Sequence, residues 1–383
     1  MNRPAGAGPS PHRGTSLSGG PNRGGPSGLV AALQRHWTVQ ALAGAALIAV
    51  ALLMVAVWGW SSDIAGQGEI ITFFINVLIV LGIQVFSGNS GILSFGHLAF
   101  VGVGAYVGGI LMLDPYFKQG LTGLPVALRA EQLAFLPATL VAAGAAGVVA
   151  LLVGIPLMRL SGAAAVIAIL SLLLISNVIF SGWTEVTRGA GGIYAVPDDT
   201  TVSWAFGWAV VAVACARVFK DSGYGLQLQA SRDDGLAAAS IGVSIFHRRL
   251  LAWVISAVLC GVAGAVSAAF LTAFSPSNFL LQQTFIVIVM FIAGGMGTVS
   301  GAVLGAGVIT FLQEFLRGYE GTRVDIGFVH LSRLTGLTQL LLAVIILAVM
   351  YVRPRGIVDV LEFDETLRLW VRKWKAQRQA IPR

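Results

Sequence analysis

Residues 70–113 read IITFFINVLIVLGIQVFSGNSGILSFGHLAFVGVGAYVGGILML and contain no Asp, Glu, Lys or Arg. Two apolar runs, 70–86 and 91–113, lie on either side of a short break that contains Ser, Gly and Asn. A helix of about 20 apolar residues crosses the hydrocarbon core of a bilayer, and it satisfies its own backbone hydrogen bonds there. The stretch therefore predicts membrane-spanning helices rather than a soluble core.

The composition of the whole chain extends this interpretation. Of the 383 residues, 56% are hydrophobic and 11% are charged, and the mean hydropathy is +0.83. A soluble domain carries about 25% charged residues, so the outer surface of this protein must be largely apolar. The two cysteines, Cys215 and Cys260, lie inside apolar runs and have neither metal-ligand nor disulfide spacing. We predict an all-α fold, a polytopic transmembrane helix bundle of about ten spans.

The count of ten rests on ten apolar runs. They cover residues 39–60, 70–86, 91–113, 133–158, 163–182, 202–219, 250–274, 279–293, 298–316 and 334–352. The runs 70–86 and 279–293 are short for a full crossing, and the glycine-rich starts at Gly91 and Gly297 are compatible with re-entrant segments. Eight or nine crossings are therefore the alternative to ten.

The formal net charge of +7 is explained by the two tails of the chain. Residues 1–37 carry four Arg and no acid, and residues 353–383 carry eight Lys or Arg against four acids. With ten crossings and the amino terminus inside, 18 basic residues fall on the cytoplasmic side and 6 on the other. Because basic residues concentrate on the cytoplasmic side of membrane proteins, we predict that both termini are cytoplasmic. Basic tails beside membrane segments favour contact with membrane lipid and argue against nucleic acid as a partner.

Three segments follow from this organisation. Residues 1–37 contain a stretch rich in Gly, Pro and Ser, which predicts a disordered basic cytoplasmic tail. Residues 38–352 are expected to form the transmembrane domain, and residues 353–383 a second basic cytoplasmic tail. A cleaved signal peptide is not expected, because the first apolar run leads to Trp58 and Trp60 rather than to an Ala-x-Ala site.

The longest cytoplasmic connection, residues 220–249, carries the signals of a short helix. Ser231 precedes Asp234 by three positions, as in a capping box, and the carboxylate of Asp234 suits the positive end of a helix through residues 236–239. Gly242 is well placed to end that helix. A short helix on the cytoplasmic side is a surface that a soluble partner can hold. The alternative is a solvated loop with a chance helical turn.

Three stretches of the chain form a recognisable pattern. Residues 88–106, GNSGILSFGHLAFVGVGAY, are the first, the loop 220–249 with the start of the next run is the second, and residues 294–298 with the glycines after them are the third. Together they resemble the membrane permease subunits of branched-chain amino acid type ABC importers, whose signature is G-x-x-G-x-x-S-x-G-H-x-x-F-x-G-x-G-A-Y. Gly235 stands where this family usually has Glu, and Ala302 where Pro is common, so no role of that Glu is carried over.

The resemblance implies a transport subunit that performs no covalent chemistry. It implies a second homologous permease subunit, two cytoplasmic ATPase subunits and an extracytoplasmic solute-binding protein as partners, in the cytoplasmic (inner) membrane of a bacterium. The sequence contains no Gly-Lys pair and hence no GxxxxGK[ST] phosphate-binding loop, so no cofactor is expected in this chain and ATP is expected on the ATPases. The resemblance assigns ATPase coupling to the loop, at Arg232, Asp233, Asp234, Ala238 and Gly242.

Polar residues within the apolar runs are candidates for a solute path, because they are costly to expose to lipid. They are Asn76, Gln84, Ser94, His97, Ser171, Ser176 and Asn177, and the glycines Gly88, Gly91 and Gly96 accompany them. The alternative is hydrogen bonding between helices, which we favour for His97 because no partner for a ligand site is visible beside it. For the glycines we favour close packing or a break in the helix.

These features favour an importer of a small polar solute, a branched-chain amino acid in the first place, with urea or a short amide as the alternative. A self-sufficient secondary transporter would need charged residues inside the spans, and few are present. A membrane enzyme would need clustered His, Cys, Asp or Glu, whereas the five histidines, at 12, 36, 97, 247 and 330, are scattered. No metal site is expected.

Overall fold

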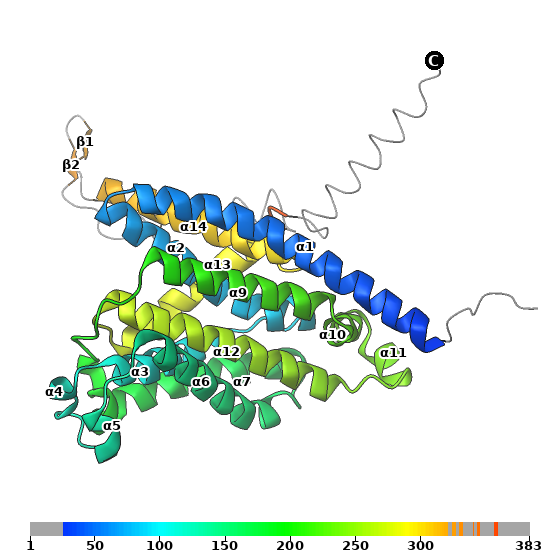
Figure 1. Cartoon of the computed structure of the whole chain (residues 1–383), viewed down its shortest axis with the longest axis horizontal. Helices are drawn as coiled ribbons and strands as arrows, with labels where there is room; N and C mark the ends of the chain where they lie inside the picture. The colour runs from blue at the N-terminus through cyan, green and yellow to red at the C-terminus, as the bar shows by residue number, and fades with distance from the viewer. Residues whose placement is uncertain are drawn as a thin grey trace, which may run out of the picture.

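The computed structural model describes residues 26–320, together with 324–326, 329–331, 340, 343–344 and 356–358. In this part of the chain, eight helices are long and apolar enough to cross a membrane. They are α1 (Pro26–Ser61), α2 (Ile64–Ile83) with its π-helical continuation η1 (Gln84–Gly88), α6 (Phe135–Leu157), α7 (Gly162–Gly182), α9 (Val202–Asp221), α12 (Ile245–Leu271), α13 (Leu281–Gly294) preceded by η3 (Pro276–Phe279), and α14 (Val299–Glu320). The predicted helical, multi-pass fold is confirmed (Figure 1).

Shorter elements connect these spans. They are α3 (His97–Met112), α4 (Pro115–Lys118), α5 (Val126–Ala130), α8 (Thr184–Thr187), η2 (Gly189–Gly191), α10 (Gly223–Asp233) and α11 (Gly235–Ser240). The strands β1 (Val324–Ile326) and β2 (Val329–Leu331) pair as a small antiparallel hairpin with Val324 opposite Leu331. The long helices lie side by side, with α10 and α11 at one end of the bundle and α4 and α5 at the other (Figure 1).

The predicted apolar runs coincide with helices wherever the structure describes them, except at the start of the run 91–113. The run 334–352 falls almost entirely outside the described residues, so ten crossings and the side of each terminus stay predictions. Within 91–113, only His97–Met112 is helical, and the preceding residues 91–96 form no helix. The shortfall begins at Gly91, whose φ of +73° is left-handed and ends a helical path.

Helix α3 is consequently too short to cross a bilayer unaided. Its 16 residues rise about 24 Å at ~1.5 Å each, less than the ~30 Å of a hydrocarbon core. The missing depth is supplied by residues 91–96, of which Gly91 is exposed, Ser94 and Gly96 are buried and the rest are partly buried. Irregular backbone is tolerated at membrane depth when protein surrounds it. The break therefore begins at an exposed glycine beside η1 and enters the bundle interior towards Gly96.

Helices α2 and α12 form the centre of the bundle. In its most apolar window α2 is 94% buried and α12 is 72% buried, whereas α1 is 28% and α7 is 22% buried. The apolar side chains of α1 and α7 face outward, where lipid would cover them without cost. Every side chain of α2 from Ile70 onward is at least partly covered by other helices, which gives this helix contacts on all sides.

Small residues set the distance between α3 and α12. A Cβ atom at Gly104 would collide with the backbone of Gly261, and one at Gly264 would collide with the carbonyl oxygen of Val101. The same close approach joins α13 to α14, where Gly294 lies against Gly301 and Gly305. These are the small-residue spacings that allow membrane helices to pack backbone to backbone.

Two basic side chains fasten the connections at the α4–α5 end. The Lys118 ammonium is fully buried and donates to the carbonyl oxygens of Leu111, at 3.2 Å, and Glu131. Burial lowers the pKa of Lys118, while the carboxylates of Asp114 and Glu131 act in the opposite direction. Arg188 donates to the carbonyl oxygen of Phe117 at 2.6 Å. These bonds tie the end of α3 to the loops around it.

Candidate functional site

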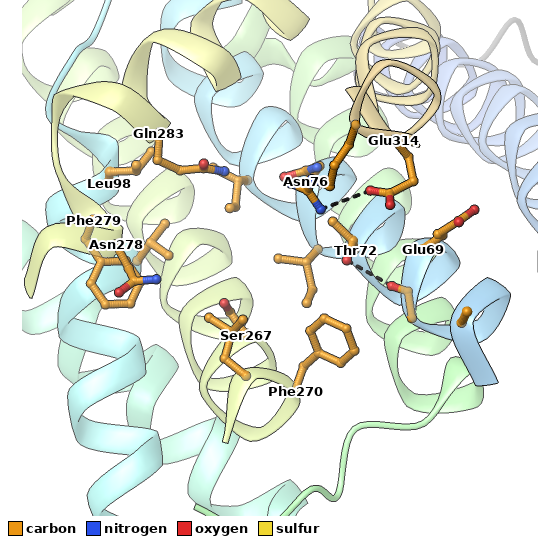
Figure 2. Close-up of a pocket in the computed structure, with 17 residues that line it drawn as sticks. Glu69, Thr72, Asn76, Leu98, Ser267, Phe270, Asn278, Phe279, Gln283 and Glu314 are labelled. Atoms are coloured by element: carbon orange, nitrogen blue, oxygen red, sulfur yellow. Dashed lines mark hydrogen bonds and ion pairs between the residues drawn. The ribbon is translucent and has the colours of Figure 1, made fainter. Parts of the chain in front are cut away.

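A pocket of about 580 Å³ lies among α2, α3, α12, η3, α13 and α14. It lies along the first half of α2, between Ala65 and Ile79, whereas the last turn of that helix approaches α10. The pocket therefore belongs to the end of the bundle opposite α10 and α11. Figure 2 shows residues from several helices facing one space, among them Thr72, Ser267, Phe270, Asn278 and Glu314, with Glu69 at its edge.

Charged side chains occupy the mouth of this pocket. Glu69 near the start of α2 and Glu314 near the end of α14 supply two carboxylates. Arg317 supplies a guanidinium, and its Nη1 atom lies 3.1 Å from Oε2 of Glu314. Glu69 has no ion pair in the described part of the chain, so the pocket carries one carboxylate that is not neutralised by a base.

Amide groups and apolar side chains line the rest of the pocket. Asn278 and Gln283 face the space, and Asn76 is nearly buried, with its Nδ2 atom donating to Oγ1 of Thr310 at 2.9 Å. The apolar wall consists of Ile75, Ile79, Leu98, Val101, Phe270, Leu271 and Phe279. Small-molecule sites combine an apolar lining with a few placed polar groups, as here. A solute with an ammonium group, a carboxylate and an aliphatic portion matches this lining.

Of the polar and charged residues that line the pocket, the sequence analysis predicted Asn76 but not Glu69, Glu314 or Arg317. Glu69 lies one residue before the apolar run 70–86, and Arg317 one residue after the run 298–316. Such positions normally indicate solvated helix ends, so these residues were not candidates. A usable signal was the i, i+3 spacing of Glu314 and Arg317, which places both on one helix face.

The other predicted path residues lie outside this pocket. Gln84 is fully buried in η1, and neither atom of its side-chain amide has a hydrogen-bond partner among the described residues. His97 lies at the start of α3, where Nδ1 is 2.6 Å from Oγ of Ser94 and Nε2 is 2.9 Å from Oγ of Ser256. The second contact joins α3 to α12, which is the inter-helix bonding considered for His97 in the sequence.

The polar residues of α7 are also distant from the pocket lining. The hydroxyls of Ser171 and Ser176 donate to carbonyl oxygens of their own helix, at 2.9 and 2.8 Å. Asn177 donates to the carbonyl oxygen of Pro276 at 3.0 Å and so ties α7 to η3. Gly96 lies against the carbonyl oxygen of Ile169, where any side chain would collide. Asn177 thus holds α7 to η3, and Gly96 lets α7 pack against the start of α3.

The cytoplasmic loop predicted at 220–249 contains two helices, α10 and α11, rather than one. Asp234, predicted only to suit the positive end of a short helix, is the N-cap of α11, with Oδ1 accepting from the backbone N–H groups of Leu236 at 2.9 Å and Ala237 at 3.0 Å. Ser231 does not cap it, because this residue lies inside α10 and its hydroxyl donates to the carbonyl oxygen of Leu228. Gly242 follows α11 with φ +87°, and its N–H donates to the carbonyl oxygen of Ala239.

The two faces of α10 and α11 differ in exposure. Ala238 is buried, whereas Leu236 and Ile241 are 87% and 78% exposed, and the carboxylate of Asp233 is open to solvent. Exposed aliphatic side chains of this kind on a polar segment indicate a contact surface for another chain. The surface is formed by α11 and lies at the end of the bundle remote from the pocket.

The inner side of α10 is bonded to the broken segment between α2 and α3. Nη1 of Arg232 donates to the carbonyl oxygen of Gly88 at 2.9 Å, and Nε2 of Gln229 donates to Oδ1 of Asn89 at 3.0 Å. A Cβ atom at Gly91 would lie 2.5 Å from Cγ of Arg232, so the missing side chain lets the arginine lie across the backbone. The predicted loop residue Arg232 and the predicted path residue Gly91 are thus in direct contact.

Charge within the spans is sparse, as the sequence indicated, with one notable exception. Arg217 of α9 is almost fully buried, and its Nη2 atom lies 3.7 Å from Oδ2 of Asp221. Gly44 of α1 makes room for this guanidinium, because a Cβ atom there would collide with it. Within the described residues, no group of three or more His, Cys, Asp or Glu side chains could hold a metal ion.

Comparison with known proteins agrees with the sequence pattern. A family model described as the branched-chain amino acid transport system permease component matches residues 67–350. The chain is 28% identical over 311 residues to the high-affinity branched-chain amino acid transport system permease protein LivM of Escherichia coli K12, covering 72% of this chain and 69% of the relative. It is 27% identical, with the same coverage, to the LivM protein of Salmonella typhimurium.

A more distant similarity covers part of the chain. A probable branched-chain amino acid transport permease protein LivH of Methanocaldococcus jannaschii is 27% identical over 140 residues, covering 36% of this chain and 41% of the relative. No solved structure matches the chain at a significant level.

Proposed function

Because this chain belongs to the family of branched-chain amino acid transport permease components, we propose that it forms part of the membrane path of an ATP-driven amino acid importer. The chain itself is a permease component and not an enzyme. The proposed cargo is a small zwitterionic amino acid with an aliphatic side chain, moved inward across a bacterial cytoplasmic membrane. Both termini face the cytoplasm in this proposal.

The observation that carries the proposal is the combination of groups in the pocket. Glu69 is suited to hold a solute ammonium group, and Arg317 is suited to hold a carboxylate beside Glu314. Ile75, Ile79 and Val101 supply an aliphatic wall for the side chain. The volume of about 580 Å³ lies within the range of small-molecule sites, roughly 300–1,000 Å³.

The proposed partner subunits are assigned from the end of the bundle that carries α10 and α11. The similar proteins are permease proteins of a branched-chain amino acid transport system, and this chain is likewise proposed to work with partner subunits of an ABC transporter. We propose that two cytoplasmic ATPase subunits bind ATP and that one of them docks on α11 around Leu236 and Ile241. A second homologous permease subunit completes the path, and an extracytoplasmic binding protein delivers the solute to the pocket end. This chain then needs no cofactor of its own.

A neutral amide such as urea is the second candidate cargo. The side chains of Asn76, Asn278 and Gln283 could hydrogen-bond an amide. The carboxylate of Glu69 favours the zwitterion instead, because a neutral solute leaves this carboxylate without a cationic partner, whereas Glu314 is already paired with Arg317.

Uptake by the reconstituted complex tests this function. The complete importer, purified through a tag on this chain, is placed in proteoliposomes with ATP inside the compartment that the ATPases face, and uptake of labelled leucine is measured. We expect ATP-dependent uptake that excess valine inhibits and excess urea does not. Uptake by this chain alone without ATPase subunits would overturn the proposal, and inhibition by urea but not by valine would replace the cargo.

A further inference from the structure

The pocket ends inward at a layer of fully buried side chains. Ile79 lines the pocket on α2, and Phe86 lies seven residues further, about two turns away on the same helix face. Val101 lines the pocket on α3, and His97 lies one turn before it. Following each lining face away from the pocket therefore leads to Phe86 and His97, whose side chains are at most 1% exposed.

The third helix that lines the pocket, α12, leads to the same layer of buried side chains. Ser267 of α12 lines the pocket, and Ser256 lies eleven residues earlier, about three turns away on the same face. Ser256 is fully buried, and its Oγ atom lies 2.9 Å from Nε2 of His97. The faces of three helices that open onto the pocket thus converge on Phe86, His97 and Ser256, and His97 contacts both of the others.

We call these three residues, Phe86, His97 and Ser256, the inner plug. The rings of Phe86 and His97 have centroids 5.8 Å apart. Trp253 backs the plug from the α6 side, with its ring centroid 5.0 Å from both. A solute in the pocket has no open route toward α10 past this layer, because aromatic contacts of this density exclude water.

The plug is attached to the cytoplasmic helix α10. Phe86 belongs to η1, and the carbonyl oxygen of Gly88, two residues later, accepts the 2.9 Å hydrogen bond from Arg232. Asn89 accepts a second bond from Gln229, on the same side of α10. A displacement of α10 is therefore transmitted directly to η1 and the residue after it, through these two hydrogen bonds.

The segment that carries Phe86 has an unusual backbone form and buries polar groups without partners among the described residues. It is π-helical, a form that is rare and concentrates at functional sites. The amide of Gln84 and the hydroxyl of Ser87 are buried there without hydrogen-bond partners in the described part of the chain. An unpartnered buried polar group disfavours the conformation that buries it, relative to one that pairs it. A second conformation of η1 is thus favoured by two groups at once.

Resting on the proposed transport function, we propose that the inner plug is the cytoplasmic gate of the solute path and that Arg232 positions it. When a partner ATPase moves α10, Arg232 carries the Gly88 carbonyl with it, and Phe86 leaves the ring of His97. Gln84 and Ser87 then face the opened path and gain partners from solute or solvent. The chemical class of the ligand that passes is the zwitterion held in the pocket.

Cysteine labelling in the complete importer tests the gate. Ser87→Cys is introduced together with Cys215→Ala and Cys260→Ala, and the rate of modification by a membrane-impermeant thiol reagent is measured from the ATPase side. We expect the rate to differ about tenfold between the nucleotide-free complex and the complex trapped with ATP and vanadate, as when an open state changes from roughly 10% to dominant. Adding Arg232→Ala should abolish the difference. Equal rates with and without nucleotide would overturn the gate.

Thr139→Cys in the same background is the matched control. Thr139 is fully buried on α6 with its hydroxyl bonded to Phe135 of its own helix, and no plug residue is adjacent in sequence. It should stay unmodified in every state. Modification at Thr139 as well would mean general loosening of the bundle, which also overturns the gate.

A leak measurement covers the case in which the cysteine variant assembles poorly. Phe86→Ala and the milder Phe86→Leu should let preloaded leucine leave the vesicles without ATP, and the alanine variant should leak faster. Tight vesicles with both variants contradict the proposal. If the wild-type importer shows no ATP-driven uptake, the proposed function fails; if it shows uptake while Ser87→Cys ignores nucleotide, only the gate fails.

Discussion

The two halves of α2 differ in how their polar groups are satisfied. The half from Ala65 to Ile79 faces a pocket with charged and amide side chains, and its buried amide, Asn76, has a partner in Thr310. The half that continues into η1 carries the unpartnered amide of Gln84 and is bonded through its backbone to Arg232. The first half carries the groups suited to bind a solute. The second half is bonded to α10, the helix that we propose moves it.

The largest effect is expected at the moved half. Arg232→Ala should lower ATP-driven uptake about 100-fold, because a hydrogen bond from a charged group contributes up to ~3 kcal/mol. ATP hydrolysis by the complex should fall far less, so the ratio of uptake to hydrolysis is the measurement. Arg159→Ala, an exposed arginine on the loop between α6 and α7, is the matched control and should keep that ratio. A parallel loss of hydrolysis and uptake would speak for an assembly defect instead.

The next effect concerns the recognising half. Glu69→Gln should raise KM for leucine about tenfold and leave kcat nearly unchanged, since the charge-assisted bond to the ammonium group is weakened. Transport kinetics of the reconstituted importer measure both constants. Asp63→Asn is the control, because Asp63 caps the same end of α2 outside the pocket and asparagine caps equally well. An unchanged KM would remove Glu69 from the solute site.

A pair of glutamines compares the two halves in stability. Gln84→Leu should stabilise the folded protein by about 1 kcal/mol, because it removes a buried amide that lacks partners. Gln132→Leu should destabilise it by about as much, because Nε2 of Gln132 donates to the carbonyl oxygen of Met112 at 2.8 Å. Thermal unfolding in detergent compares them. Destabilisation by both variants would mean that Gln84 is satisfied after all.

The smallest effect is expected at α11, the exposed helix that follows α10. Asp234→Ala removes the cap of α11 and should cost roughly 0.5–1 kcal/mol locally. Hydrogen exchange at the amides of Leu236 and Ala237 should accelerate up to about fivefold, whereas Asp234→Asn should leave it near the wild-type rate. Acceleration of equal size in the α2 amides would mean that the cap supports the whole bundle.

The spans and the short helix that follows Asp234 could be predicted because their signals are local. An uncharged run such as 202–219 determines a helix on its own, and Asp234 binds backbone groups only two and three residues away. The family pattern added the importance of 88–106 and of the loop around Arg232. The signals for these parts of the molecule lie in residues that are close together in the sequence.

The pocket and the coupling contact could not be predicted because they join distant positions. Glu69 and Arg317 meet at one pocket across 248 positions of sequence, and Arg232 reaches Gly88 across 144. The π-helical turn at η1 has no hydrophobic period that distinguishes it from the α-helix before it. Ser231 was misread as a cap because the sequence alone gave no sign that α10 continues through it.

The contacts of Gly104 with Gly261 and of Gly294 with Gly301 have a mechanical consequence. Backbones that touch leave no layer of side chains that can slide or change rotamer, so α3 with α12 and α13 with α14 are each expected to move as one solid piece. Helix α2 contacts both pairs, and it makes one close approach to α12 at Gly82, where a Cβ atom would lie 2.6 Å from Sγ of Cys260. The two rigid helix pairs then lie on either side of α2, and α2 is the helix expected to shift between them. Its inner end continues into η1, which is the part that α10 contacts.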